Sequence, residues 1–203
     1  MVAENIRLRM AGQDDVEVVA AIMTEVSEGV IDHLLGGLFP GMSPSKILEM
    51  ILLRGNGNLN LKNVLLVEAD QKLAGLLFSY DAREQRVSSV MEGFLGARKI
   101  EEMRPLLEAR ADDALWINTL WVHEDFRGRG LAQLLVNLAG DLARDMGLTH
   151  LALHCWSDNV RAKRFYEAQQ FERRGAIATA PALRERHPQA GELWVKSLSR
   201  QAE

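Results

Sequence analysis

The sequence predicts an α/β fold built as a single domain over residues 1–203. Three observations lead to this prediction: the chain opens with a strand pattern followed by a helix pattern, two short apolar segments near residues 64–79 form a hairpin pattern, and the second half alternates strand and helix patterns. A chain of 203 residues with 47% hydrophobic content can also bury a sizeable core.

The composition argues against several kinds of partner. The 24 Lys and Arg residues against 28 Asp and Glu residues give a net charge of −4, so we expect no nucleic-acid partner. The single cysteine, Cys155, rules out an intramolecular disulfide and a zinc site built on thiolates, and we expect no metal. The sequence contains no signal-peptide pattern and no run of about 20 apolar residues, so we expect a soluble, cytoplasmic protein without a membrane partner.

The chain opens with a strand and a helix. Ile6, Leu8 and Met10 alternate with two arginines, which predicts a half-buried strand. Asp14 and Asp15 then stand where they can cap a helix. The apolar residues of that helix recur at helical spacing: Val18, Val19, Ile22, Met23 and Val26.

A second helix and a hairpin follow. Residues 45–53 form a helix pattern that ends at the glycine- and asparagine-rich run 54–58, which we expect to be a mobile surface loop. Residues 64–68 and 73–79 predict an antiparallel hairpin.

The second half has the clearer patterns, and Gly147 ends its long helix. We expect strands at 115–122, 148–156, 171–177 and 193–198, and helices at 131–146 and 159–169.

The turn Arg127-Gly128-Arg129-Gly130-Leu131-Ala132 predicts a phosphate site. It joins a predicted strand to the start of the long helix, whose first backbone N–H groups attract an anion. The glycines permit close backbone approach, and the arginines add positive charge. A Walker A loop is excluded because neither Lys nor Ser or Thr follows Gly130. A dinucleotide fingerprint would need glycine at Gln133 and a shorter linker after the strand, which leaves an NAD- or NADP-dependent oxidoreductase as a weaker alternative.

A second motif runs from Asn159 through Ala162, Phe165 and Tyr166 to Phe171. Together with the turn, over about residues 115–171, it resembles the GNAT superfamily of acetyl-CoA-dependent N-acetyltransferases. The turn matches that family's Q/R-x-x-G-x-G/A pattern at each specified position. The chain departs from the family at position 170, where a glutamine replaces the usual glycine. The resemblance implies a mixed, mostly antiparallel sheet with helices on both faces and two central strands that splay apart to admit the cofactor.

The resemblance also implies roles for single residues. Acetyl-CoA would be the cosubstrate, with its pyrophosphate on the turn and its pantetheine amides paired to the backbone of a strand segment and to the second motif. The cofactor-binding residues are then Leu120, Trp121, Val122, Arg127, Gly128, Arg129, Gly130, Leu131, Ala132, Asn159 and Ala162. Tyr166 would stand beside the thioester sulfur, where its hydroxyl can protonate the leaving thiolate. Because Asn159 and Tyr166 are seven residues apart on one helix, both can face the same ligand.

The general base stays open. The family often places a carboxylate on the strand that this chain builds with Asn118 and Thr119, so the candidates are Glu124, His154 or a water molecule. His154 can equally be a packed strand histidine. Tyr166 can be a core aromatic, and Asn159 can simply be a helix N-cap.

The resemblance implies acetyl transfer from acetyl-CoA to a primary amine by direct attack, without a covalent enzyme intermediate. The alternative is a non-catalytic CoA-binding regulatory module. We expect a small-molecule or peptide amine as substrate, and a homodimer is compatible with the sequence. Residues 81–113 predict a helical insertion, which Pro105 would interrupt if it lay deep inside a helix. With the loop 36–45, this insertion is expected to shape the amine site, because it carries the carboxylates of Glu84, Glu101 and Glu102.

Overall fold

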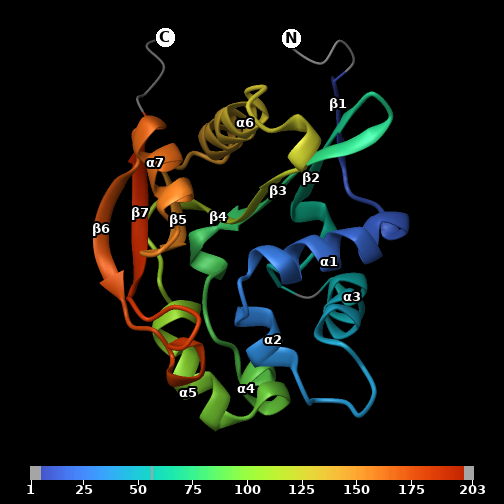
Figure 1. Ribbon diagram of the computed structural model, residues 1–203, viewed down its shortest axis with the longest axis vertical. Coiled ribbons are helices and arrows are strands. Elements are labelled where there is room, and N and C mark those ends of the chain that lie inside the picture. The colour runs from blue at the N-terminus through green and yellow to red at the C-terminus, as the bar shows by residue number, and fades with distance from the viewer. Residues whose placement is uncertain (1–5, 56, 199–203) are drawn as a thin grey trace. The chain divides into compact units, whose positions relative to one another are not determined.

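The computed structural model describes residues 6–55 and 57–198 (Figure 1). The predicted α/β class is confirmed: seven strands form a mixed, mostly antiparallel sheet with the order β1-β2-β3-β4-β5-β7-β6. Backbone contacts group the chain into two compact units, which are described separately below. Unit 1 holds the chain up to Tyr80 together with Ile117–Ala139, and unit 2 holds Asp81–Trp116 and the chain from Gly140 onward.

The strands of unit 1 are built around a hairpin. The described strands are β1 (Ile6–Met10), β2 (Val64–Ala69), β3 (Lys72–Asp81) and β4 (Ala114–Val122), the last two of which end or begin in unit 2. The predicted hairpin is confirmed, since β2 and β3 pair antiparallel with Val64 opposite Phe78. Its two turn residues, Asp70 and Gln71, have φ of 52° and 65°, as a tight hairpin turn requires.

Strand β1 differs from its prediction in burial. It is a strand and pairs with β2, but Ile6, Leu8 and Met10 are 36%, 42% and 51% exposed. The predicted half-buried face is therefore wrong, because β1 is the first strand in the sheet order and is covered less than the strands inside it. Arg9 fastens β1 through ion pairs of 2.6 Å to Asp15 and 2.6 Å to Glu68.

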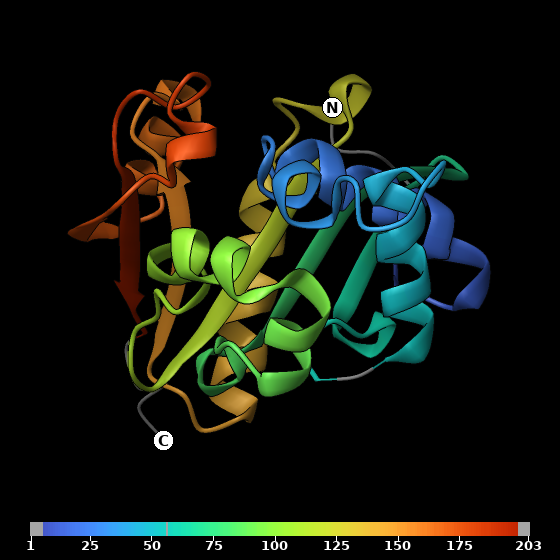
Figure 2. The same cartoon turned by 90° about the horizontal axis from the view of Figure 1, so that it is seen from below.

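The helices of unit 1 lie on both sides of its strands. They are α1 (Val16–Val26), α2 (Val30–Leu35), α3 (Pro44–Arg54) and the first part of α6 (Leu131–Asp145). Figure 2 shows α1 and α3 on one side of β2 and β3 and α6 on the other. The structure confirms the helices predicted after Asp15 and at 45–53, whereas α2 was not predicted. Of the expected loop at 54–58, Gly55 ends α3 with a φ of 63° and Asn56 lies outside the described residues.

Unit 2 is a three-stranded antiparallel ladder with helices. Strand β7 (Gly191–Ser197) pairs on one side with β5 (His150–Trp156) and on the other with β6 (Glu172–Ile177), and α7 (Val160–Ala168) lies between β5 and β6 in the chain. The segment 81–113 is helical as expected, with α4 (Ser89–Leu95) and α5 (Ala97–Leu107). Pro105 lies two residues before the end of α5. Within residues 6–55 and 57–198, no helix is long and apolar enough to cross a membrane.

Candidate functional site

The predicted phosphate turn lies in unit 1, at the start of α6. Gly128 and Gly130 have φ of 75° and 83°, in the left-handed region that favours glycine. A Cβ on either residue would meet nothing within 4 Å, so the backbone faces open space. The Leu134 N–H donates to the Gly130 carbonyl at 3.0 Å, which marks the first turn of α6. The backbone N–H groups of the first turn of a helix have no acceptor within the helix, and such groups commonly bind anions.

The two arginines of the turn supply charge around that site. Arg127 Nε donates to the Val122 carbonyl at 3.1 Å, which ties the turn to the end of β4. The Arg129 guanidinium lies 5.2 Å from the ring centroid of Phe126, and that ring is itself buried. Both arginines are exposed. Leu131 is buried and fixes the first residue of α6 in the core of unit 1.

The end of β4 leads into the phosphate turn through residues 123–126. Leu120, Trp121 and Val122 are half-buried. The His123 N–H donates to the Ala74 carbonyl at 3.0 Å, so the end of β4 is held on β3 near the hairpin. Glu124 is exposed and begins the short 3-10 helix Glu124–Phe126. This candidate base therefore lies beyond the end of the strand, next to the phosphate turn.

The second motif builds α7 in unit 2. Asn159 accepts a hydrogen bond from the Ala162 N–H at 3.1 Å, which confirms the N-cap reading of Asn159. The helix ends at a left-handed residue, Gln170, with a φ of 66°. The Gln170 N–H donates to the Glu167 carbonyl at 2.9 Å and the Phe171 N–H to the Tyr166 carbonyl at 3.0 Å. This pair of bonds is a Schellman motif, the helix end at which glycine is most often found.

Tyr166 lies beside two other aromatic rings and near the thiol of Cys155. Its ring contacts Phe165 and Phe171 at centroid distances of 5.4 and 5.5 Å. Burial raises the pKa of the Tyr166 hydroxyl above its usual range, and the nearby Cys155 raises it further. The hydroxyl is protonated at neutral pH, as an ordinary phenol also is, and the raised pKa makes it a weaker acid.

On β5, His154 lies on the face opposite to that of Cys155. Successive strand residues point to opposite faces, so His154 shares a face with Trp156 and not with Cys155. Its ring contacts the Trp156 ring edge to face at 4.5 Å, and a Cβ on residue 191 would overlap Nε2. Nε2 is buried and forms no hydrogen bond within the described chain. Burial, aided by the charge of His187, lowers the pKa of His154 to about 4. This geometry matches the alternative in which His154 is a histidine packed on the strand.

Three residues of unit 2 form a cluster that was not predicted. The buried His187 ring lies parallel to the Trp156 indole, with centroids 4.0 Å apart and an angle of 3°. Its Nδ1 lies 3.2 Å from an Asp158 oxygen. Asp158 and His187 are 29 positions apart in the chain, and no local pattern connects them.

The buried carboxylate of Glu192 on β7 was also not predicted. It accepts from Trp194 Nε1 at 3.1 Å and pairs with Arg173 at 2.9 Å and Lys163 at 3.4 Å. Because Lys163 lies on α7 and Arg173 on β6, Glu192 fastens the Tyr166 helix to the ladder.

The predicted residues thus separate into two sets. Unit 1 holds Leu120, Trp121, Val122, Glu124 and residues 127–132, and unit 2 holds His154, Asn159, Ala162 and Tyr166. Two of the three carboxylates expected to attract an amine are paired: Glu101 with Arg104 at 3.0 Å and Glu102 with Arg98 at 3.1 Å.

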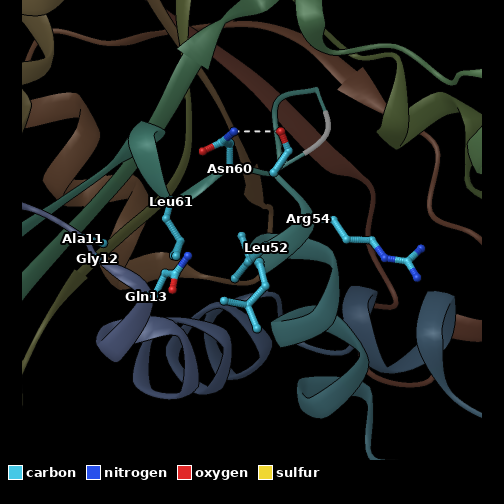
Figure 3. A pocket seen from close by; sticks show the side chains of 9 residues that line it. Ala11, Gly12, Gln13, Leu52, Arg54, Asn60 and Leu61 are labelled. Atoms are coloured by element: carbon cyan, nitrogen blue, oxygen red, sulfur yellow. Dashed lines mark hydrogen bonds between the residues drawn. The ribbon is translucent and has the colours of Figure 1, made fainter.

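A shallow pocket in unit 1 is separate from the phosphate turn. It lies where β1 ends and β2 begins, at the end of these strands away from the hairpin (Figure 3). The Asn60 amide donates to the Gly55 carbonyl at 2.7 Å, and the Arg54 side chain points away from Leu52 and Leu61. Two of the polar side chains that line this pocket, those of Asn60 and Arg54, are thus turned to the backbone or away from the hollow, and we assign the pocket no ligand.

Comparison with known proteins agrees with the two motifs. Residues 57–171 match the Acetyltransferase (GNAT) family. GCN5-related N-acetyltransferase 4, chloroplastic, of Arabidopsis thaliana is 27% identical over 96 residues, which is 46% of this chain and 33% of that protein. An uncharacterized N-acetyltransferase of Bacillus subtilis, YdgE, is 38% identical over 52 residues, 26% of this chain and 33% of that protein. The matched segments therefore span about a third of each curated relative.

The fold has solved counterparts as well. The crystal structure of an N-acetyltransferase from Staphylococcus aureus Mu50 superposes with a TM-score of 0.64. It is 20% identical in sequence, and the match covers 93% of this chain and 99% of that one. At this identity the likeness shows the fold.

Proposed function

The chain belongs to the GNAT family of acetyltransferases, and from that premise we propose that it is an N-acetyltransferase that moves the acetyl group of acetyl-CoA to a primary amine. The observation that carries the proposal is the open glycine turn at the start of α6. Its left-handed glycines, outward N–H groups and two exposed arginines are what a pyrophosphate needs.

The remaining contacts to acetyl-CoA follow the family pattern. The backbone of Leu120, Trp121 and Val122 pairs with the pantetheine amides as an added strand would. Ala132 and Leu131 present their N–H groups to the pyrophosphate. Asn159 and Ala162, at the first turn of α7, contact the pantetheine arm.

Tyr166 is the proton donor of the proposed reaction. The amine lone pair attacks the acetyl carbonyl carbon, the new C–N bond forms, and the C–S bond breaks to release CoA as a thiolate. A thiolate of this kind takes a proton at a pKa of about 8.5. The Tyr166 hydroxyl supplies that proton and then takes up the proton that the amine nitrogen loses.

The alternative is a CoA-binding module that regulates without catalysis. Thermal unfolding with acetyl-CoA, followed by a thiol-release assay over a panel of amines, separates the two. We expect a concentration-dependent rise of the midpoint and thiol release with at least one amine. A rise without any amine-dependent thiol release would favour the regulatory module, and no rise with no release would contradict both.

A further inference from the structure

The middle of β4 presents an exposed amide between two buried residues. Asn118 is exposed, whereas Ile117 and Thr119 on either side are 3% exposed each. Since β4 lies inside the sheet order, an exposed side chain on it means that no helix or loop covers this face of the strand at that residue. The sheet face is therefore open at Asn118.

Both polar atoms of the Asn118 side-chain amide form hydrogen bonds. Its Nδ2 donates to the Tyr80 hydroxyl at 3.2 Å, and its Oδ1 accepts from the Thr119 hydroxyl at 3.2 Å. Tyr80 is on β3 and is 3% exposed, so its ring cannot turn away. The result is a fixed, uncharged polar surface on this part of β4.

The position of Asn118 along β4 suits the acceptor amine. A strand rises about 3.3 Å per residue, so Asn118 lies roughly 13 Å before Val122, on the side away from the phosphate turn. An arm that starts at the turn and pairs with Leu120–Val122 brings its thioester end toward Asn118. Glu124 lies past Val122, at the phosphate end.

Three groups among the described residues that could act as a base are held by other contacts. Asp81, next in the chain after Tyr80, is bound by Arg83, which holds the pKa of that carboxyl below its usual range. In unit 2, Nε2 of His154 is buried against Gly191, and His187 is buried and bonded to Asp158.

We infer, on the basis of the proposed function, that Asn118 and Tyr80 form a neutral acceptor subsite that takes amines already uncharged near neutral pH, such as α-amino groups and aromatic amines, in preference to lysine side chains and polyamines. A protonated amine has no lone pair with which to attack. An α-amino group has a pKa of about 8 and a lysine side chain about 10.4. At pH 7.5 roughly a quarter of the first, but only about one in a thousand of the second, is neutral.

The test compares amines of different pKa on the intact protein. A peptide with a free N-terminus and acetylated lysines is paired with the same peptide carrying an acetylated N-terminus and one free lysine, and an aromatic amine is paired with a polyamine. We expect kcat/KM at pH 7.5 to favour the low-pKa member of each reactive pair by about 10²-fold. In log(kcat/KM) against pH, the upper break should follow the pKa of the amine. A break at one pH for every amine would reveal a base on the protein and would overturn the inference.

Two variants test the residues themselves. In Asn118→Asp, Tyr80 can turn its hydroxyl to donate, so the pair is kept while a carboxylate enters the subsite. We expect kcat/KM for the high-pKa amine to rise at least about tenfold. Asn137→Asp, which adds the same charge to an exposed amide on α6, should leave that ratio unchanged. Tyr80→Phe should raise KM for the amine but not for acetyl-CoA.

The experiments distinguish a failure of the proposed function from a failure of the neutral subsite. If acetyl-CoA neither stabilises the protein nor releases thiol with any amine, the proposed function fails. If thiol is released and the high-pKa amines are equal or better substrates, or if Asn118→Asp changes the selectivity no more than Asn137→Asp, only the neutral subsite fails.

Discussion

The Phe171 N–H donates to the Tyr166 carbonyl at 3.0 Å, and the two rings meet edge to face with centroids 5.5 Å apart. The backbone bond is the one of the two Schellman hydrogen bonds that spans six residues. The ring contact is the apolar contact that accompanies this motif. The end of α7 thus fixes both the backbone and the ring of the proposed proton donor. Gln170 lies between them in a left-handed conformation.

The first prediction is that Gln170→Gly stabilises the protein by roughly 1 kcal/mol, because a residue with a Cβ is strained at a φ of 66° and glycine is not. Urea unfolding measures the change. Ala168→Gly, an exposed change two residues earlier but inside the helix, should lower stability by up to about 1 kcal/mol. A lower midpoint for Gln170→Gly would mean that the glutamine side chain stabilises this helix end.

The second prediction concerns the Tyr166 hydroxyl. Tyr166→Phe keeps the ring contacts with Phe165 and Phe171, so the melting temperature should change little. Loss of the proton donor should lower kcat by about 10²-fold and leave KM for acetyl-CoA unchanged. An unchanged kcat, under conditions in which single-turnover measurements show that chemistry limits the rate, would leave Tyr166 with a packing role alone.

The third prediction separates binding from backbone strain at the phosphate turn. Gly130 and Gly147 stand at the two ends of α6, both with positive φ and both with open space where a Cβ would lie. Alanine at either position should destabilise the free protein by about 1 kcal/mol. Gly130→Ala should weaken acetyl-CoA binding in calorimetry at least tenfold, and Gly147→Ala should not. Equal affinities in the two variants would place the pyrophosphate elsewhere.

The fourth prediction concerns the contact between His154 and Gly191. A Cβ at position 191 would overlap the imidazole, so Gly191→Ala should cost about 1–3 kcal/mol in thermal unfolding. Gly175→Ala on the neighbouring strand β6, where a Cβ would meet nothing within 4 Å, is the matched control and should be nearly neutral. His154→Ala should restore much of the loss in the double variant. If it does not, the cost of Gly191→Ala has another source.

Part of this architecture was predictable because local chemistry determined it. The positive φ angles of Gly128 and Gly130 are needed wherever the chain turns into α6 at this angle, and glycine signals that need in the sequence. The same holds for Asn159, whose side chain caps α7. The long helices and the hairpin followed from apolar spacing alone.

The rest depended on contacts between distant residues. Alternation along Ile6–Met10 predicted the strand correctly but its burial wrongly, because burial depends on how much of the strand other elements cover. Helix α2 is only six residues long and too short for a periodic pattern. His187 meets Asp158 and Trp156 only because the chain returns after β6, and Glu192 meets Lys163 and Arg173 for the same reason. The bond between Asn118 and Tyr80 requires the register of β4 on β3.

The exposed strand β1 bears on the order in which unit 1 folds. The β2–β3 hairpin closes over two residues and forms on the microsecond timescale, whereas the Arg9–Glu68 pair joins residues 59 positions apart and must first close that long loop. With little apolar surface to bury, β1 gains little in return for this loss of chain entropy. We therefore expect β1 to join last and to open first, so that in hydrogen exchange the amides of Ile6–Met10 lose protection before those of β3 while the rest of unit 1 stays folded.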